Sequence, residues 1–398
     1  MNHVQHAVFE QLGGSPSALG WKLWNRDDSR VVYRLGIAGD FLPASGLLPP
    51  EGCTWSHMAS AMDPCFQDLN IAFANLECPV DVHGSRPRIK WGMGDSFSAP
   101  EEALEFLVSL NCKAVGLANN HIYDYGSTGV ECTKRAIRAR GIHCFGSGST
   151  LAEAPEVLVL ATGGVRIGFW AAARGLAESA REDVAGVEPA TPKRARQALA
   201  ELQKQGAVVK IALLHTGLEH TNRPDPDDVS LIDFLAGLGF DVVAACHSHR
   251  ISGYKSVSRE GSHPAFCFYG LGSLSSGVVY TPLEREGLLV VAGLDEGGEV
   301  VQVEVRPLCL TEKGWASVPH SEGRKAILDR FGRLSYEIQD GSYRRRFYKD
   351  IRAGLLTRQI RDMRVAVGQG GLRGLIGKLS RVRMRHVRRL AHQCWLGS

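Results

Sequence analysis

The 398-residue sequence lacks a long uninterrupted apolar run. Its best candidate, residues 157–173 (VLVLATGGVRIGFWAAA), has Arg166 and two adjacent glycines in its middle, whereas a membrane-spanning helix needs about 18 to 20 consecutive apolar residues. The N-terminal residues carry neither the basic segment nor the continuous apolar segment of a secretory signal. These absences predict a cytoplasmic protein without a spanning helix.

Close cysteine pairs are also missing. The ten cysteines are irregularly spaced and include no C-x-x-C pair, which disfavours a zinc-thiolate site. A chain of this length does not need a disulfide framework to fold. We therefore expect most of the cysteines to be reduced thiols in the core.

Acidic residues are scarce in the last part of the chain. Residues 341–398 hold 15 Lys and Arg but only Asp350 and Asp362, a net charge of +13 that leaves −9 for the remainder. Their arginines stand among apolar residues at near-helical spacing, which is typical of a helix lying on an anionic membrane surface. A basic helix packed against the acidic body is the alternative. Nucleic-acid binding is disfavoured, because aromatic residues are sparse in this segment and no known module is present.

Short apolar runs alternate with amphipathic segments from residue 31 to about residue 290. The apolar runs read as strands, and the segments between them place apolar residues at i, i+3 and i+4, as in helices. This alternation predicts a layered α/β fold. A hairpin with its turn at Gly297-Gly298 is expected to follow. We divide the chain into an N-terminal extension (1–30), an α/β domain (31–310) and a basic, mostly helical C-terminal region (311–398).

Polar residues recur directly after the predicted strands. They are Asp40; Asn75 and Glu77; Asn119, Asn120, His121 and Asp124; His215 and Glu219; and His247 and His249. Because ligands bind at the carboxyl ends of strands in α/β sheets, these side chains are expected to converge. Carboxylates, amide oxygens and imidazoles suit divalent Mn, Fe or Zn, and two close ions could clamp a phosphoryl group.

Each of these elements also has an ordinary structural interpretation. Asp40 could cap a turn or helix, His215 could be a satisfied core residue, and the two histidines of H-S-H could form a surface pair. Side chains at i and i+2 point the same way in an extended segment, which favours a shared role for His247 and His249. The recurrence of all five groups in order at strand ends favours a common site.

The ordered motifs resemble the CapA family of capsule and poly-γ-glutamate biosynthesis proteins, over residues 33–280. The matching segments are GD (39–40), NLE (75–77), ANNHIYDYGSTGV (118–130), GIHCFGSGS (141–149), HTGLEH (215–220), CHSH (246–249) and FYGLGS (268–273). The resemblance implies a calcineurin-like metallophosphoesterase fold, a four-layered α/β/β/α sandwich with a site for one or two divalent metal ions at one end.

The resemblance also implies roles for individual residues. The implied metal ligands are Asp40, Glu77 as the bridging carboxylate, Asn120, His215, His247 and His249. His121 stands in the position of the proton donor or transition-state stabiliser, and Asp124 would orient it. We add Glu219 to the candidate catalytic residues, and Asn75 and Asn119 as candidate substrate contacts.

The chain departs from the family pattern at three motifs. Phe41 and Leu42 follow Asp40 where the superfamily commonly has Asp-x-His, so that one metal position has one ligand fewer. H-S-H replaces the common H-P-H, and Gly272-Ser273-Leu274 replaces the family's G-N-F.

The resulting functional prediction is a CapA-like, metal-dependent hydrolase of extracellular polymer biosynthesis. A metal-bound hydroxide is expected to attack a phosphoester or an acyl or peptide bond of an anionic polymer or peptide. One alternative is a non-catalytic accessory subunit of a membrane polymer-synthesis complex, and another is a metal-independent CapA-like peptide epimerase. Residues 341–398 would provide a peripheral contact with the inner face of the membrane.

Overall fold

The computed structural model describes residues 14–44, 46–82, 85–87, 96–153, 155–176, 178–261 and 263–350. The chain divides into two units, Met1–Gln339 and Asp340–Ser398. Most of the second unit lies outside the described residues, and with it most of the basic segment 341–398 for which a membrane contact is predicted. Within the described part of the chain, no helix combines the length and the apolar character that crossing a bilayer requires.

The larger of the two main sheets contains ten strands. Its order is β1-β2-β17-β16-β3-β4-β5-β6, with β15 beside β3 and β18 beside β17. The strands are β1 (Ser15–Pro16), β2 (Trp21–Asn25), β3 (Tyr33–Leu42), β4 (Ile71–Leu76), β5 (Cys112–Gly116), β6 (His143–Phe145), β15 (Ser273–Ser276), β16 (Glu286–Leu294), β17 (Val300–Leu310) and β18 (Ala316–Ser317). Strands β15, β3, β4, β5 and β6 are parallel to one another. Their carboxyl ends therefore share one edge.

The second main sheet has the order β13-β14-β12-β11-β9-β8. Its strands are β8 (Val157–Thr162), β9 (Val165–Ala173), β11 (Val209–His215), β12 (Val242–Cys246), β13 (Tyr254–Val257) and β14 (Ala265–Phe268). Strands β9, β11, β12 and β14 are parallel. A separate pair is formed by β7 (Ser147–Ser149) and β10 (Gly186–Val187).

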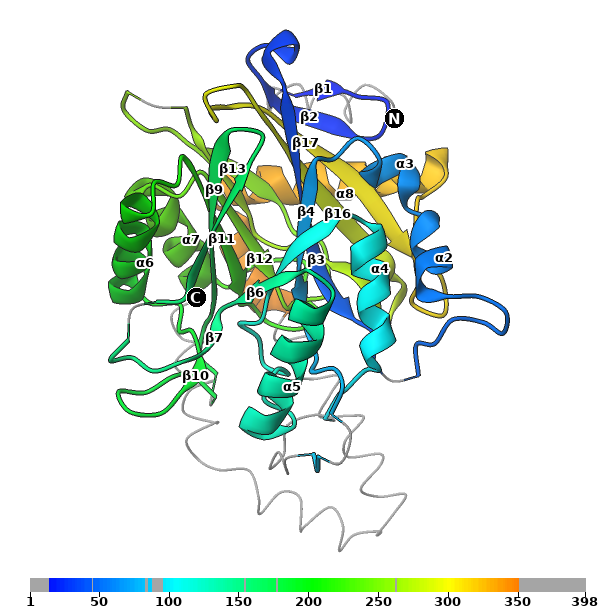
Figure 1. Ribbon diagram of the computed structural model, residues 1–398. Coiled ribbons are helices and arrows are strands. Elements are labelled where there is room, and N and C mark those ends of the chain that lie inside the picture. The colour runs from blue at the N-terminus through cyan, green and yellow to red at the C-terminus, as the bar shows by residue number, and fades with distance from the viewer. Residues whose placement is uncertain are drawn as a thin grey trace, which may run out of the picture. The chain divides into compact units, whose positions relative to one another are not determined.

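Helices cover the outer faces of the two sheets (Figure 1). The helices are α2 (Trp55–Ser60), α3 (Asp63–Phe66), α4 (Leu104–Ser109), α5 (Gly126–Ala139), α6 (Pro192–Lys204), α7 (Pro226–Leu238) and α8 (Ser321–Gln339). The described residues also contain the 3₁₀ helices η1 (Asp28–Arg30), η2 (Glu101–Ala103) and η3 (Pro282–Arg285). Helices α6 and α7 each begin with a capped first turn: the Thr191 and Asp225 side chains accept a backbone N–H, and a proline follows each cap.

The main core lies between the two sheets. The Phe73 ring of β4 meets the Phe169 ring of β9 edge-on with centroids 4.6 Å apart, and Phe145 of β6 lies 6.0 Å from Phe169. All three rings are buried. Helix, sheet, sheet and helix thus form the four-layered sandwich, which confirms the predicted fold class.

Truncating Phe169 to alanine should destabilise the protein by about 3 to 5 kcal/mol, because it leaves a cavity between the two sheets. Chemical denaturation of Phe169→Ala against the wild type measures this loss. Val184→Ala is the matched control, since Val184 is 53% exposed and its truncation should change stability by less than about 0.5 kcal/mol. Equal midpoints for Phe169→Ala and the wild type would contradict this account of the core.

Two segments outside residues 31–310 also belong to the first unit. Strand β2 pairs antiparallel with β17, so that part of the N-terminal extension adds a strand to the larger sheet. Residues 311–339 contribute β18 and α8, and the Tyr254 N–H donates to Ser335 Oγ of α8 at 2.9 Å. The predicted hairpin is confirmed as β16 and β17, with Gly298 at φ +83° in its turn.

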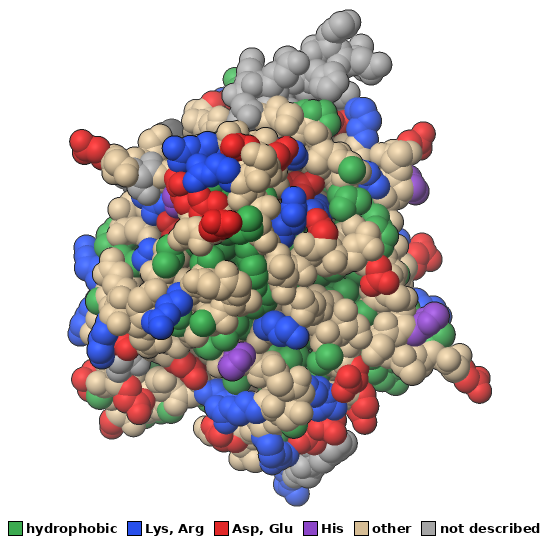
Figure 2. All heavy atoms as spheres, turned by 45° about the horizontal axis from the view of Figure 1, so that its top comes forward, with side chains coloured by type: hydrophobic (Ala, Val, Ile, Leu, Met, Phe, Trp, Pro, Cys, Tyr) green, Lys and Arg blue, Asp and Glu red, His purple; other side chains and the backbone are tan. Residues whose placement is uncertain are grey.

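The surface carries both signs of charge. Lys, Arg, Asp and Glu side chains are interspersed on the face shown in Figure 2, with hydrophobic side chains in small groups between them. The nine described cysteines are free thiols, of which Cys65, Cys78, Cys112, Cys246 and Cys267 are buried. The expected burial thus holds for five of the nine described cysteines, and their reduced state stays a prediction.

Candidate metal centre

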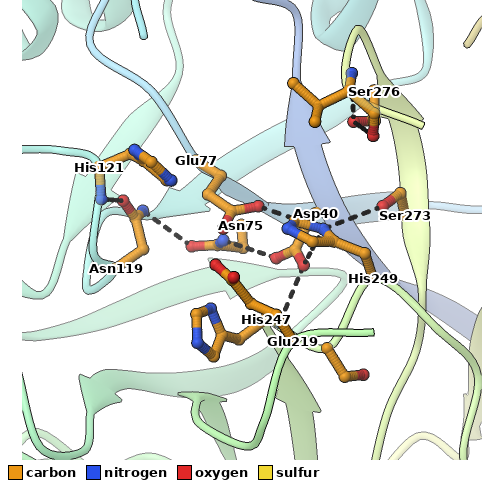
Figure 3. Close-up of polar contacts among 12 residues, drawn as sticks. Asp40, Asn75, Glu77, Asn119, His121, Glu219, His247, His249, Ser273 and Ser276 are labelled. Carbon is orange, nitrogen blue, oxygen red and sulfur yellow. Dashed lines mark hydrogen bonds and ion pairs between the residues drawn. The ribbon is translucent and has the colours of Figure 1, made fainter. Parts of the chain in front are cut away.

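The carboxyl ends of strands from both sheets bring the predicted polar residues together (Figure 3). Asp40 is on β3 and pairs in register with Asn75 of β4, and Glu77 follows that strand. His215 ends β11, and His247 and His249 follow β12, its parallel neighbour. In each sheet these residues lie at the carboxyl ends of neighbouring parallel strands. The side chains converge, as the sequence leads us to expect.

Two groups of potential metal ligands share one carboxylate. The first group is Glu77, His215 and His247, and the second is Asp40, Glu77 and His249; in each, one ligand atom per residue lies within 4.8 Å of the others. The His215 Nε2 atom is 3.3 Å from Glu77 Oε1, and the His249 Nδ1 atom is 3.8 Å from Glu77 Oε2. The two oxygens of Glu77 therefore face different imidazoles, as a carboxylate that bridges two ions would.

Burial shifts the pKa of each of these donors toward its neutral form. It raises the pKa of Asp40 to about 7, although the His247 N–H and Asn75 Nδ2 donate to the Asp40 carboxylate at 2.9 and 2.7 Å. Burial also lowers the pKa of His215, and that of His249 to about 3, so these imidazoles are neutral with lone pairs available. Buried carboxylates beside neutral imidazoles form a donor set that fits a divalent ion.

The H-S-H segment holds its two histidines in an unusual backbone conformation. His247 and His249 have positive φ values of +103° and +54°. Residues other than glycine rarely adopt a positive φ. Such residues cost about 1 to 3 kcal/mol each and cluster at functional sites. His247 Nδ1 is buried and has no hydrogen-bond partner among the described residues. These features support a functional role for the H-S-H segment.

Three asparagines surround the two donor groups. Asn120 Oδ1 lies 2.8 Å from His215 Nε2, beside the first group. Asn75 donates to Asp40, and Asn119 Nδ2 donates to Asn75 Oδ1 and the Leu76 carbonyl at 3.1 and 2.8 Å. Because Asn75 and Asn119 are buried and use their amides inside the protein, these contacts favour a supporting role. Their contact with substrate stays a prediction.

His121 and Asp124 form a buried pair next to these groups. His121 Nδ1 is 2.8 Å from Asp124 Oδ2, which also accepts the Phe97 N–H at 2.7 Å. The Phe97 ring packs against the imidazole with centroids 4.7 Å apart. A carboxylate only accepts hydrogen bonds, so Nδ1 carries the proton of this contact. A role of Nε2 in proton transfer stays a prediction.

Glu219 lies outside the inner cluster. Its side chain is 45% exposed, and its Oε2 is 3.9 Å from His220 Nε2. The structure thus places this candidate at the rim, and its catalytic role stays a prediction.

Two sets of residues contact the candidate ligands or the segments that carry them but were not predicted from the sequence. Ser273 Oγ is 3.4 Å from His249 Nδ1, and the Ser273 backbone pairs with Asp40. Asp228 accepts from Thr216 Oγ1 at 2.6 Å and pairs with Arg174, whose N–H donates to the His215 carbonyl at 3.2 Å. Arg174 directly follows β9, so the rule that located the other residues at strand ends could have found it. Asp228 lies on α7 and carried no such signal.

Fold and donor set together define an α/β sandwich protein with a candidate dinuclear metal centre at the carboxyl ends of its strands. The model of the family described as bacterial capsule synthesis protein PGA_cap matches residues 34–277. The chain belongs to this family, and the resemblance to the CapA proteins is confirmed.

Two curated relatives carry names from capsule or polymer synthesis. The capsule biosynthesis protein CapA of Bacillus anthracis is 23% identical over 256 residues, which are 63% of this chain and 61% of that protein. The chain therefore spans about three fifths of that relative's length. The PGA biosynthesis protein CapA of Bacillus subtilis is 24% identical over 288 residues, 70% of this chain and 73% of that protein.

Among solved structures, the calcineurin-like phosphoesterase YfkN from Bacillus subtilis is similar to the chain. It is 13% identical, with a TM-score of 0.41, and the match covers 77% of this chain and 98% of that one.

Proposed function

We propose that this protein is a metal-dependent hydrolase that cleaves a phosphoester or an acyl or peptide bond during synthesis or trimming of an extracellular anionic polymer. The observation that carries this proposal is the sharing of Glu77 between two buried donor groups. A bridged pair of ions is the arrangement that stabilises both the attacking and the leaving oxygen in hydrolysis.

Two groups of side chains would hold the ions, and neighbouring residues would support them. Glu77, His215 and His247, with the Asn120 oxygen beside them, would hold one ion, and Asp40, Glu77 and His249 the other. Asn75 would keep Asp40 in place through its hydrogen bond. When bound, divalent ions supply Lewis-acid stabilisation of negative charge on the reacting group.

His121 would handle the proton in this reaction. Asp124 accepts from Nδ1 and fixes the ring, so Nε2 is the atom that delivers a proton to the leaving group or receives one. Because His121 is 7% exposed, bulk water competes little for that atom. Membership of the capsule synthesis family supports a polymer substrate, and for this chain the polymer is part of the proposal.

The proposal predicts hydrolysis that depends on added metal. Full-length protein without a histidine tag is stripped with a chelator and then supplied with Mn²⁺, Fe²⁺ or Zn²⁺. It is assayed with bis(p-nitrophenyl) phosphate and with a γ-glutamyl oligopeptide, and nitrophenolate or free amine should appear only after metal is restored. Asp40→Asn, treated in the same way, should remain inactive because one donor group has lost a carboxylate.

Other outcomes would favour the alternatives. Bound metal without cleavage of either probe would contradict the hydrolase and favour an accessory subunit. Solvent deuterium entering an α-carbon of the peptide in metal-free protein would favour epimerisation instead.

A further inference from the structure

A buried carboxylate on α7 contacts residues next to the first donor group. Asp228 is 3% exposed and belongs to neither group of potential ligands. Its Oδ1 atom accepts hydrogen bonds from the Thr216 hydroxyl at 2.6 Å and from Arg174 Nη1. Thr216 directly follows the candidate ligand His215. Asp228 therefore reaches the first donor group through residues beside the ligands.

Thr216 connects the two segments that carry the histidines of this group. Its N–H donates to the Cys246 carbonyl at 3.1 Å, and Cys246 directly precedes His247. His215 and Cys246 are also partners in the register of the parallel strands β11 and β12. A side chain that holds Thr216 in place consequently constrains the ends of both strands.

Arg174 connects the same carboxylate to the strand on the opposite side of β11. It directly follows β9, and its N–H donates to the His215 carbonyl at 3.2 Å. Its guanidinium pairs with Asp228 through Nη1 and donates to Asp227 Oδ2 at 3.0 Å through Nη2. Asp228 is thus linked to His215 by two short routes, one through Thr216 and one through Arg174.

Helix α7 gives the carboxylate a fixed position. The Asp225 side chain caps the helix by accepting the Asp227 N–H at 2.9 Å. Ile232 and Leu235, further along the helix, are fully buried. Asp228 lies in the first turn between the cap and these buried residues, so the carboxylate is anchored to the helix rather than to the loop that it contacts.

The two donor groups have different supports. Asn75 donates to Asp40 in the second group at 2.7 Å, whereas the contacts of Asp228 lead to His215 and His247 in the first. The charge of Asp228 also acts on His247: burial lowers the pKa of that imidazole, and the carboxylates of Glu219 and Asp228 oppose the shift. Changing Asp228 should therefore affect one metal position more than the other.

We propose that Asp228 is a positioning residue that sets the affinity of the metal position formed by Glu77, His215 and His247, without being a ligand. This inference rests on the metal centre of the proposed function, and it does not depend on which bond the protein cleaves. Loss of the carboxylate should weaken binding of this ion by about 10- to 100-fold, the range for residues that orient metal ligands. Binding at Asp40, Glu77 and His249 should be unchanged.

Mn²⁺ binding to untagged, full-length protein tests this role without an activity assay. Equilibrium dialysis gives the dissociation constants, and electron paramagnetic resonance distinguishes a spin-coupled pair of ions from an isolated ion. At the Mn²⁺ concentration that just saturates the wild type, the wild type should show the coupled pair and Asp228→Ala the isolated ion. Anomalous diffraction from Asp228→Ala crystals at that concentration should locate the remaining ion at Asp40, Glu77 and His249.

Matched variants separate this role from a general loss of stability. Asp228→Asn keeps an oxygen that can accept from Thr216 and should recover part of the affinity. Thr216→Val removes the hydroxyl and should weaken binding of the same ion, whereas Thr216→Ser keeps the hydroxyl and should bind both ions. Asp233→Ala is the control, because it removes a carboxylate of α7 that accepts from Tyr269 and Lys255 at 2.7 and 2.8 Å. It should also retain both ions.

Several results would overturn the inference. They are equal affinity of Asp228→Ala and the wild type for both ions, or equal weakening at the two positions. If Asp228→Ala does not fold, equal Mn²⁺ binding by Thr216→Val and Thr216→Ser would refute the role, because both variants keep the carboxylate. A wild type that binds no Mn²⁺ would refute the metal centre itself and the role of Asp228 with it. Bound Mn²⁺ without hydrolysis would refute only the proposed reaction.

Discussion

Replacing Glu77 by glutamine is expected to remove metal from both positions of the candidate centre. Glu77 belongs to both donor groups, and each of its oxygens faces a different imidazole. The amide that replaces it has one oxygen and no charge, so neither ion retains its bridging ligand. The affinity for both ions should fall by more than about 100-fold, beyond the 10- to 100-fold typical of outer-shell changes.

Mass spectrometry on untagged protein measures the number of metal ions per chain in the wild type and in each variant. Two ions are expected per wild-type chain and none per Glu77→Gln chain. Asp40→Asn and His247→Ala each alter one group and should retain one ion. Glu312→Gln is the matched control, because its carboxylate is 88% exposed on the surface, and it should retain two. Glu77→Gln protein that retains both ions would contradict the shared-ligand arrangement.

Removing the His121 imidazole is expected to lower turnover while leaving the metal content unchanged. His121 belongs to neither donor group, and Nε2 is the atom that we propose exchanges the proton, because Nδ1 faces the Asp124 carboxylate. Loss of a general acid or base usually costs about 10²- to 10⁴-fold in rate. We expect His121→Ala to lower kcat within that range on whichever probe the wild type cleaves.

Asp124→Asn provides the companion measurement. An asparagine can turn its N–H₂ toward the ring, so that Nδ1 becomes the acceptor and Nε2 the protonated nitrogen. This variant should also lose turnover without losing metal. His143→Ala removes an exposed histidine of β6 and serves as the control that retains wild-type kcat. Full turnover in His121→Ala would exclude His121 from proton transfer.

Much of the architecture was readable from the sequence because it depends on local patterns. Alternating apolar runs and amphipathic segments define strands and helices, and the parallel arrangement that follows brings strand ends together. Asp40, Glu77, His215, His247 and His249 could therefore be predicted as neighbours although they are far apart in the chain.

Other parts of the site could not be predicted, because they depend on pairings between distant segments. Asp228, on a helix, contacts the residue that follows His215 at the end of a strand. No periodicity links such residues. The exposed position of Glu219 was equally unpredictable, since residues after a strand can face the site or the solvent.

The pairing of β2 with the larger sheet could not be predicted for the same reason. Its partner β17 is about 280 residues further along the chain, and register shifts in their pairing between Val303 and Glu304. A five-residue strand gives too short a pattern for assignment from sequence.

Anomalous X-ray diffraction from wild-type crystals grown with Mn²⁺ would test the central claim most directly, since it locates each ion relative to Glu77. The account predicts two anomalous peaks, one at Glu77, His215 and His247 and one at Asp40, Glu77 and His249, with Glu77 bound to both. Crystals of protein saturated with Mn²⁺ that show no peak at either group would contradict it.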